Sequence, residues 1–275
     1  MRRIKDFSLK KASYIKIGEK ADVLIAENHS DLIEASGMKR PKILGAMSNI
    51  LFASDKYDYT FIILGSEFEK IELSRDGIVK AGAGVRVASL LSFMKENLLT
   101  GYEELAGIPG SLGGMLLMNA GANKKCISDN LIEFDTLSRN SVKKNQAKFS
   151  YRKSSIDEPI ESLTFHFEKS SKERIENKTN EIISKRRESQ PLDKPSLGCV
   201  FKNPSPDNPA WKLIHSVGMA GVCEDGVCVS KKHANFIVNE ADGKSQNFLK
   251  LSEEIRKRVM EKHNIKLEYE IEILF

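Results

Sequence analysis

The most informative segment of this 275-residue chain is Gly107-Ile108-Pro109-Gly110-Ser111-Leu112-Gly113-Gly114-Met115-Leu116-Leu117-Met118-Asn119-Ala120-Gly121-Ala122. Glycine permits positive φ and close backbone approach, so that successive N–H groups can converge on an anion without side chains in the way. The density of glycines in this run therefore predicts a loop that holds a phosphate-bearing cofactor.

A second glycine-containing loop is Leu44-Gly45-Ala46-Met47-Ser48-Asn49-Ile50-Leu51, which follows a strand-like segment. Its small residues, hydroxyl and amide can wrap a pyrophosphate, and an ordinary turn is the alternative interpretation. Two further glycine patterns are predicted to be turns. Gly243-Lys244-Ser245 lacks the earlier glycine of a Walker loop, and Gly82-x-Gly84 has Val87 at the third glycine position of a dinucleotide fingerprint.

Outward from these loops, short strand-like runs alternate with helical ones, which indicates an α+β fold. Residues 21–26 and 61–64 are typical of strands, whereas the apolar positions from Val87 to Leu98 fit one face of a helix. A polar helix over residues 172–189 must stop at Gln190-Pro191, where we place a domain boundary.

The remaining third of the chain reads as a second, smaller unit. Residues 198–264 contain strands and a helix over residues 246–263, in which Leu251, Ile255 and Val259 mark a buried stripe. Residues 267–273 alternate between apolar side chains and three glutamates, which predicts a closing strand.

Charge and cysteine usage exclude several classes of protein. The 43 Lys and Arg and 38 Asp and Glu residues are interspersed, so the net charge of +5 gives no nucleic-acid stripe. No apolar run approaches the ~18 residues of a membrane span, and we expect a cytoplasmic protein. The chain has no C-x-x-C pair, and its cysteines are too few for a disulfide scaffold, so we expect reduced thiols and no metal. The cysteines are Cys126, Cys199, Cys223 and Cys228.

Together with three other motifs, the glycine-rich run resembles the family of UDP-N-acetylenolpyruvoylglucosamine reductases, or UDP-N-acetylmuramate dehydrogenases, in its compact subclass. The other motifs are PSLGCVFKNP at residues 195–204, VSKKHANFIVN at residues 229–239, and the acidic C-terminal strand. The resemblance implies an FAD-binding domain of the PCMH or vanillyl-alcohol-oxidase type, with two α+β subdomains, over residues 1–184. It also implies a smaller α+β substrate-binding domain over residues 185–265, and a strand over residues 266–275 that returns to the active site.

The family's reaction belongs to peptidoglycan precursor synthesis, which serves cell-wall formation, cell shape and cell division. The resemblance implies that NADPH reduces FAD, and that UDP-N-acetylglucosamine enolpyruvate is then reduced to UDP-N-acetylmuramate. The expected partner is thus a small molecule, with no nucleic acid and no membrane, and we expect a monomer.

Three residues match catalytic positions of the family. Arg152 matches the arginine that pairs with the substrate carboxylate, and Cys199 stands where a serine usually protonates the intermediate. The exchange keeps a proton donor, because a thiol has a pKa of ~8.5. Glu270 matches a glutamate that assists protonation. Without the resemblance, these residues have ordinary interpretations as a surface arginine, a small buried thiol and a solvated strand edge. The alternation of apolar and acidic residues alone does not distinguish Glu270 from Glu268 and Glu272.

The resemblance also assigns binding residues. The predicted FAD contacts are Gly45, Ala46, Met47, Ser48, Asn49, Gly107, Ile108, Pro109, Gly110, Ser111, Gly113, Gly114 and Asn119. The predicted substrate contacts are Tyr151, Arg152, Lys202 and Asn203, of which Asn203 holds the diphosphate. His233 and Lys232 are expected to shape the substrate domain.

Some positions depart from the family pattern. Ala46 and Met47 replace glycines, and the Met47 side chain would crowd FAD unless it points into the core. Glu272 replaces an Arg or Lys near the flavin, where a carboxylate opposes anionic reduced flavin unless it turns outward or pairs with a cation. Another FAD oxidoreductase of this fold and a flavin-free binder of UDP-sugars are therefore the alternative hypotheses, whereas RNA binding rests on net charge alone.

Overall fold

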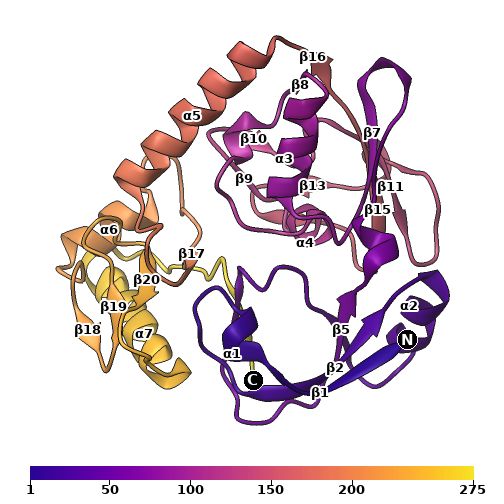
Figure 1. Ribbon diagram of the computed structural model, residues 1–275. Helices are drawn as coiled ribbons and strands as arrows, with labels where there is room; N and C mark the ends of the chain where they lie inside the picture. Colours follow the sequence, from indigo (N-terminus) through magenta and orange to yellow (C-terminus); the bar gives the residue numbers. More distant parts are fainter. The chain divides into compact units, whose positions relative to one another are not determined.

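The computed structural model describes all residues, 1–275, in two compact units that we describe separately. Unit 1 consists of Met1–Lys5, Asp22–Ala46 and Asp58–Lys185, and unit 2 consists of Asp6–Ala21, Met47–Tyr57 and Arg186–Phe275. Strands and helices alternate along the whole chain, which confirms the α+β class (Figure 1).

The first sheet has the strand order β1-β2-β5-β3, formed by β1 (Arg2–Ser8), β2 (Lys20–Ala26), β5 (Thr60–Leu64) and β3 (Pro41–Ile43). Strands β2 and β3 both run parallel to β5. Helix α2 (His29–Ser36) connects β2 to β3, and begins where the Asn28 side chain accepts a hydrogen bond from the Asp31 N–H at 3.0 Å. The end of β3 therefore delivers the chain to Gly45 at one edge of this sheet.

The second sheet of unit 1 is antiparallel, in the order β12-β11-β15-β7-β6. Its strands are β12 (Val142–Lys143), β11 (Leu131–Thr136), β15 (Ile160–His166), β7 (Ile78–Gly82) and β6 (Ile71–Leu73). Helix α4 (Leu112–Leu117) packs against β15 and β7 (Figure 1). Helix α3 (Val87–Glu96) buries Val87, Leu90 and Met94 in the same core, as its periodicity predicts.

Short elements complete unit 1. They are η1 (Ser66–Glu69), η2 (Arg75–Gly77), β8 (Leu99–Thr100), η3 (Glu103–Leu105), β9 (Gly121–Ala122), β10 (Lys125–Cys126), η4 (Lys144–Gln146), β13 (Phe149–Ser150), β14 (Lys153–Ser154) and β16 (Glu168–Lys169). The long helix α5 (Lys172–Ser189) follows and has the predicted bounds.

Unit 2 is built on an antiparallel sheet in the order β17-β20-β19-β18. Its strands are β17 (Ser196–Cys199), β20 (Phe236–Asn239), β19 (Val227–Val229) and β18 (Cys223–Glu224). Helix α7 (Ser245–His263) buries Phe248, Leu251, Ile255 and Val259 along one face, which confirms the predicted stripe. Each such side chain contributes about 1.5–3 kcal/mol to the free energy of unfolding. The other elements are α1 (Leu9–Ala12), β4 (Ile50–Phe52), α6 (Ala210–Ser216) and β21 (Glu272–Leu274).

Two expectations from the sequence are wrong. The closing strand is shorter than predicted, because only Glu272–Leu274 pair with β4, in parallel, while Tyr269 makes a single bridge to Phe201. Cys223 and Cys228 are not thiols but form a disulfide, since the register of β18 and β19 sets them directly opposite each other.

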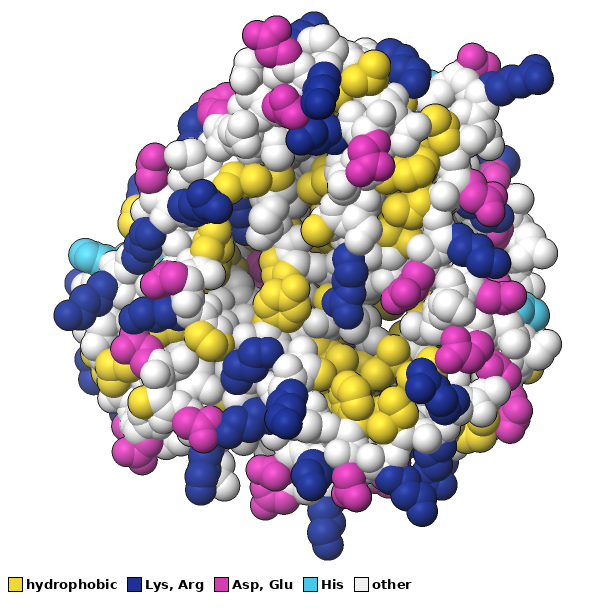
Figure 2. Space-filling model, in the orientation of Figure 1, with side chains coloured by type: hydrophobic (Ala, Val, Ile, Leu, Met, Phe, Trp, Pro, Cys, Tyr) yellow, Lys and Arg dark blue, Asp and Glu magenta, His cyan; other side chains and the backbone are white.

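The surface charges agree with the sequence analysis. On the face shown in Figure 2, Lys and Arg side chains are interspersed with Asp and Glu rather than gathered into one stripe. No helix is long and apolar enough to cross a bilayer.

Candidate active site

A groove in unit 1 gathers the ends of several elements around the glycine-rich run. The space in it that is open to water-sized molecules is about 80 Å³, which is smaller than a usual ligand pocket, so the groove is narrow. Four of the predicted cofactor residues line it, namely Gly45, Ser111, Gly113 and Gly114. The remaining lining residues are Ile43, Leu44, Ile63, Leu64, Glu69, Ala83, Gly84, Arg86, Leu117, Pro159 and Ile160.

Close packing explains why glycine occupies two of these positions. A Cβ atom at Gly45 would lie 2.4 Å from the Ser111 Oγ, and one at Gly113 would lie 2.9 Å from the Ala83 Cβ. The Gly113 N–H donates to the Ala83 carbonyl at 2.9 Å, which holds the two segments side by side. The glycines therefore let three backbone segments meet at the floor of the groove.

The first part of the glycine-rich run supports the groove rather than lining it. Gly107 has a φ of 78°, which favours glycine, and the Gly110 carbonyl accepts from the Val87 N–H at 3.0 Å. Ile108 and Pro109 lie between them and are not part of the lining.

Asn119, at the end of the run, carries an unsatisfied buried acceptor. Its side chain is 5% exposed, and its Nδ2 donates to the Ser150 carbonyl at 2.9 Å. Its Oδ1 is buried and has no hydrogen-bond partner. A buried polar atom without a partner costs about 1–3 kcal/mol, so this oxygen is suited to accept from a hydroxyl or N–H group of a bound molecule. Together with the glycine-lined groove, this acceptor fits a polar, phosphate-bearing cofactor such as FAD.

The sequence analysis missed the segment from Ala83 to Arg86. Gly84 and Arg86 line the groove, and Arg86 brings a cation to a site predicted to hold phosphate. Gly82-x-Gly84 was interpreted only as a turn because it lacks a third glycine. The signal was present in the arginine two residues after Gly84.

The second loop spans the two units. Ala46 is 6% exposed and ends a segment of unit 1, whereas Met47, Ser48 and Asn49 belong to unit 2. Met47 has a φ of 51° and is 7% exposed. Its side chain is therefore buried, as the sequence analysis required of a Met47 that does not crowd FAD. Asn49 donates from Nδ2 to the Glu270 carbonyl at 3.0 Å, and its own carbonyl accepts from the Glu272 N–H at 2.9 Å. Asn49 thus anchors the C-terminal segment.

Arg152 lies at the tip of the hairpin formed by β13 and β14 in unit 1. Its φ of 54° is that of a tight turn, and its Nη2 donates to the Gly121 carbonyl at 2.8 Å. Its guanidinium also lies 5.1 Å from the ring centre of Tyr151, a side chain that is 51% exposed. The half-buried guanidinium is therefore held in place beside the glycine-rich run.

Cys199 ends β17 in unit 2, next to a break in the strand register. The pairing of β17 with β20 shifts between Ser196 and Cys199, and Gly198 has a φ of 76° with open space where a Cβ would be. Buried Asn235 fixes the chain that follows, because it accepts from the Phe201 N–H at 3.0 Å and donates to the Phe201 carbonyl at 2.8 Å. Cys199 is half-buried and outside the disulfide, at a bulge that a ligand can approach.

The structure separates the three C-terminal glutamates. Glu268 is exposed and pairs with Lys202 at 3.4 Å, and Glu272 is also exposed. Glu270 is half-buried, and its N–H donates to the Val200 carbonyl at 2.8 Å, which places its backbone beside the residue after Cys199.

The other predicted substrate residue, Asn203, lies in the loop before α6. Its Oδ1 accepts from the Ala210 N–H at 2.9 Å. The motif around His233 shapes this region, because the Ser230 Oγ accepts from the N–H groups of Lys232 and His233 at 3.2 and 3.3 Å.

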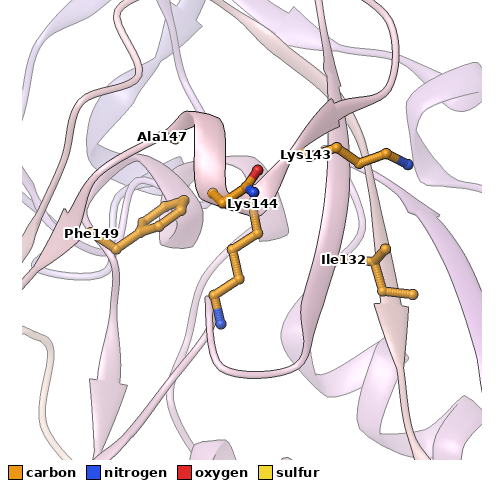
Figure 3. A pocket seen from close by; sticks show the side chains of 6 residues that line it. Ile132, Lys143, Lys144, Ala147 and Phe149 are labelled. Carbon is orange, nitrogen blue, oxygen red and sulfur yellow. The ribbon is translucent and has the colours of Figure 1, made fainter.

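An apolar hollow elsewhere in unit 1 has a different character. Figure 3 shows Lys144 between Phe149 and Ile132, with Lys143 at the side. Lys143 pairs with Glu133, and the Lys144 Nζ donates to the Asp129 carbonyl at 3.2 Å. Both ammonium groups are thus engaged, and none of the predicted site residues lies here.

Comparison with known proteins adds to this geometry. A family model described as UDP-N-acetylenolpyruvoylglucosamine reductase, C-terminal domain, matches residues 190–274, and a model described as FAD binding domain matches residues 26–141. The chain is 34% identical to a UDP-N-acetylenolpyruvoylglucosamine reductase of Fusobacterium nucleatum, over 97% of both chains. It is 36% identical to that of Fervidobacterium nodosum, over 84% of this chain and 77% of that one. The crystal structure of the reductase from Thermus caldophilus is similar over 100% of this chain and 98% of that chain, with a TM-score of 0.86 and 28% identity.

Proposed function

The chain belongs to the family of UDP-N-acetylenolpyruvoylglucosamine reductases, and we propose that it reduces UDP-N-acetylglucosamine enolpyruvate to UDP-N-acetylmuramate with FAD and NADPH. The observation that supports this most directly is the combination of a glycine-lined groove with a buried, unsatisfied Asn119 Oδ1. As a member of this family, the protein is an FAD-dependent oxidoreductase of peptidoglycan precursor synthesis.

The residues of unit 1 hold the cofactor in this proposal. FAD, when bound, accepts a hydride from NADPH and donates one to the substrate. Gly45, Gly113 and Gly114 let the backbone approach the pyrophosphate, and the Arg86 guanidinium neutralises part of its charge. Asn119 accepts a hydrogen bond from the cofactor through its Oδ1.

Arg152 stabilises the negative charge that develops on the substrate carboxylate and the adjacent α-carbon. A guanidinium suits this role because it stays protonated at working pH and donates two parallel hydrogen bonds to a carboxylate. Its bond to the Gly121 carbonyl restricts the side chain before substrate arrives, which reduces the cost of orienting it.

Cys199 donates the proton that completes the reduction. The S–H bond breaks, the proton adds to the α-carbon, and the electron pair stays on sulfur as a thiolate. A thiol is a stronger acid than the usual serine hydroxyl, so the exchange preserves the reaction. Glu270 assists this protonation. Its N–H donates to the carbonyl of Val200, the residue after Cys199, and this hydrogen bond supports a shared role for Glu270 and Cys199.

The sugar nucleotide is held mainly by its diphosphate. Asn203 donates to it from Nδ2, since Oδ1 accepts from Ala210, and Lys202 contributes a positive charge beside it. Tyr151, with its exposed ring, packs against substrate. We further propose that the protein is a cytoplasmic monomer, which light scattering of the purified chain tests against a dimer of twice its mass.

An anaerobic visible spectrum tests the proposal as a whole. Flavin bands that bleach with NADPH and return with UDP-N-acetylglucosamine enolpyruvate are the expected result. Bleaching without return identifies another FAD oxidoreductase of this fold. A protein that stays colourless after incubation with FAD is instead a flavin-free binder of UDP-sugars.

A further inference from the structure

The hairpin that carries Arg152 in unit 1 is too short to fix that residue by its own strand pairing. Strands β13 and β14 pair at two positions, Phe149 with Ser154 and Ser150 with Lys153. An isolated two-stranded hairpin is marginally stable at best in water. The φ of 54° adds to this, because arginine seldom adopts a left-handed backbone and keeps it only where the surroundings hold the chain. The position of Arg152 therefore depends on contacts outside the hairpin.

Both strands of the hairpin are hydrogen-bonded to the C-terminal end of α4 and the residues that follow it. On β14, the Ser154 Oγ donates to the Leu117 carbonyl at 2.7 Å and accepts from the Ile156 N–H at 3.4 Å. On β13, the Ser150 carbonyl accepts from the Asn119 Nδ2 at 2.9 Å. Leu117 is the last residue of α4, and carbonyls in the last turn of a helix have no partner within the helix. The Ser154 hydroxyl thus satisfies a carbonyl that the helix itself leaves open.

The bond from the Arg152 guanidinium to the Gly121 carbonyl does not replace these contacts. In the proposed function this guanidinium engages the substrate carboxylate, so the backbone beneath it needs a support that does not take part in the reaction. Asn119 is already assigned to the cofactor through its Oδ1. Ser154, two residues after Arg152, is the contact to α4 that has no other role.

We propose that Ser154 is a positioning residue for Arg152. Its hydroxyl ties the hairpin to α4, so that the guanidinium meets the substrate carboxylate in a fixed direction. The same tie relates Arg152 to the cofactor groove, because Leu117 belongs to the lining of that groove. A displacement of about 1 Å can slow a reaction about 10²-fold, so a support of this kind has a kinetic effect out of proportion to its size. This inference rests on the proposed role of Arg152.

A cycle of substitutions in the second half-reaction tests whether Ser154 acts through Arg152. Stopped-flow absorbance follows reoxidation of the NADPH-reduced flavin by UDP-N-acetylglucosamine enolpyruvate. Ser154→Ala should slow this step about 10–10²-fold and leave reduction of the flavin by NADPH within about twofold, whereas Ser154→Thr, which keeps the hydroxyl, should retain most of the rate. In an Arg152→Ala background, Ser154→Ala should have no further effect. Equal slowing by Ser154→Ala in both backgrounds, or no slowing in either, would overturn the inference.

Limited proteolysis tests the tie without any substrate. Trypsin cleaves after arginine but needs an extended segment, so Arg152 in a tethered tight turn should resist cleavage. Ser154→Ala should be cut after Arg152 about three- to tenfold faster, as measured by mass spectrometry of the fragments, while its melting temperature reports an intact fold. Ser150→Ala is the matched control and should be cut like the unsubstituted protein, because it removes an exposed hydroxyl and keeps the carbonyl that accepts from Asn119.

The two measurements separate failure of this inference from failure of the proposed function. An unchanged rate of cleavage in Ser154→Ala would show that the hydroxyl does not hold the hairpin, which overturns the inference. If the reduced flavin of the unsubstituted protein is not reoxidised by the sugar nucleotide, the proposed function fails, while faster cleavage of Ser154→Ala still supports the tie to α4.

Discussion

Replacing Gly45 with alanine probes the closest approach in the cofactor groove. The new Cβ would lie 2.4 Å from the Ser111 Oγ and 3.6 Å from the Ser111 Cβ, so the hydroxyl is the atom that must move. Ser111 is 4% exposed and begins α4, so its side chain has little space to retreat. Overpacking of this kind costs about 1–3 kcal/mol, which is the expected loss in the free energy of unfolding of Gly45→Ala.

Removing the hydroxyl should remove most of this cost. In a Ser111→Ala background the nearest remaining contact of the new Cβ is the one at 3.6 Å, which is an ordinary van der Waals distance. Ser111→Ala alone should be nearly neutral, because the Ser111 side chain makes no capping hydrogen bond. A double-mutant cycle of Gly45→Ala and Ser111→Ala should therefore show a coupling energy of about 1–3 kcal/mol between the two positions.

Urea unfolding of the apoprotein measures the free energy of unfolding of each variant in the cycle. Quenching of FAD fluorescence measures the affinity of the groove for FAD. The Ser111 hydroxyl lines the groove, so its displacement in Gly45→Ala should weaken FAD binding about tenfold or more, equivalent to at least about 1.4 kcal/mol. The double variant should recover the free energy of unfolding, whereas its FAD affinity should stay low because the Ser111 hydroxyl is absent. Equal destabilisation by Gly45→Ala in both backgrounds, or full stability of the single variant, would show that these segments do not meet as described.

Three further expectations concern the chemistry, the charges and the disulfide. Cys199→Ala should leave reduction of the flavin by NADPH nearly intact and slow the sugar-nucleotide half-reaction about 10²–10⁴-fold in stopped-flow absorbance, whereas equal loss in both would contradict a proton-donor role. Burial acts to raise the pKa of Asp135, but hydrogen bonds from Lys80, Ser141 and Ser162 lower it overall, so its stabilisation is complete above about pH 4 and disappears as the pH falls through the lowered value. Asp135→Asn should therefore cost about 1–3 kcal/mol at pH 7 and progressively less in acid, and a pH-independent difference in urea unfolding would contradict this. Thiol titration of the denatured protein should find only Cys126 and Cys199 until a reductant is added, and reduction should lower the free energy of unfolding by about 2 kcal/mol.

The sequence predicted the elements whose signal is local. The apolar spacing in α3 and α7 and the proline after α5 are properties of short segments, and the structure has these helices where they were expected. The glycine-rich run was likewise recognisable, because a requirement for close backbone approach is visible in the residue types themselves.

Features that depend on pairing between distant segments were not predictable in the same way. The disulfide requires the register of β18 with β19, which the spacing of Cys223 and Cys228 does not reveal. The part played by Arg86 depends on the meeting of its segment with Ser111, through an isolated bridge between two segments that belong to no strand. Hydrophobic patterning decides which side chains are buried, but it does not specify which backbone lies next to which.

The C-terminal glutamates show how tertiary contacts assign a role that alternation leaves open. Glu268, Glu270 and Glu272 have the same residue type and the same place in the sequence alternation, so no local property distinguishes them. Only Glu270 is half-buried, and its backbone is held from two sides, because its N–H donates to the Val200 carbonyl and its carbonyl accepts from Asn49, although the backbones of Glu268 and Glu272 also make hydrogen bonds. A carboxylate with a fixed backbone loses less conformational entropy when it engages a substrate, so Glu270→Gln should impair sugar-nucleotide turnover where Glu268→Gln does not.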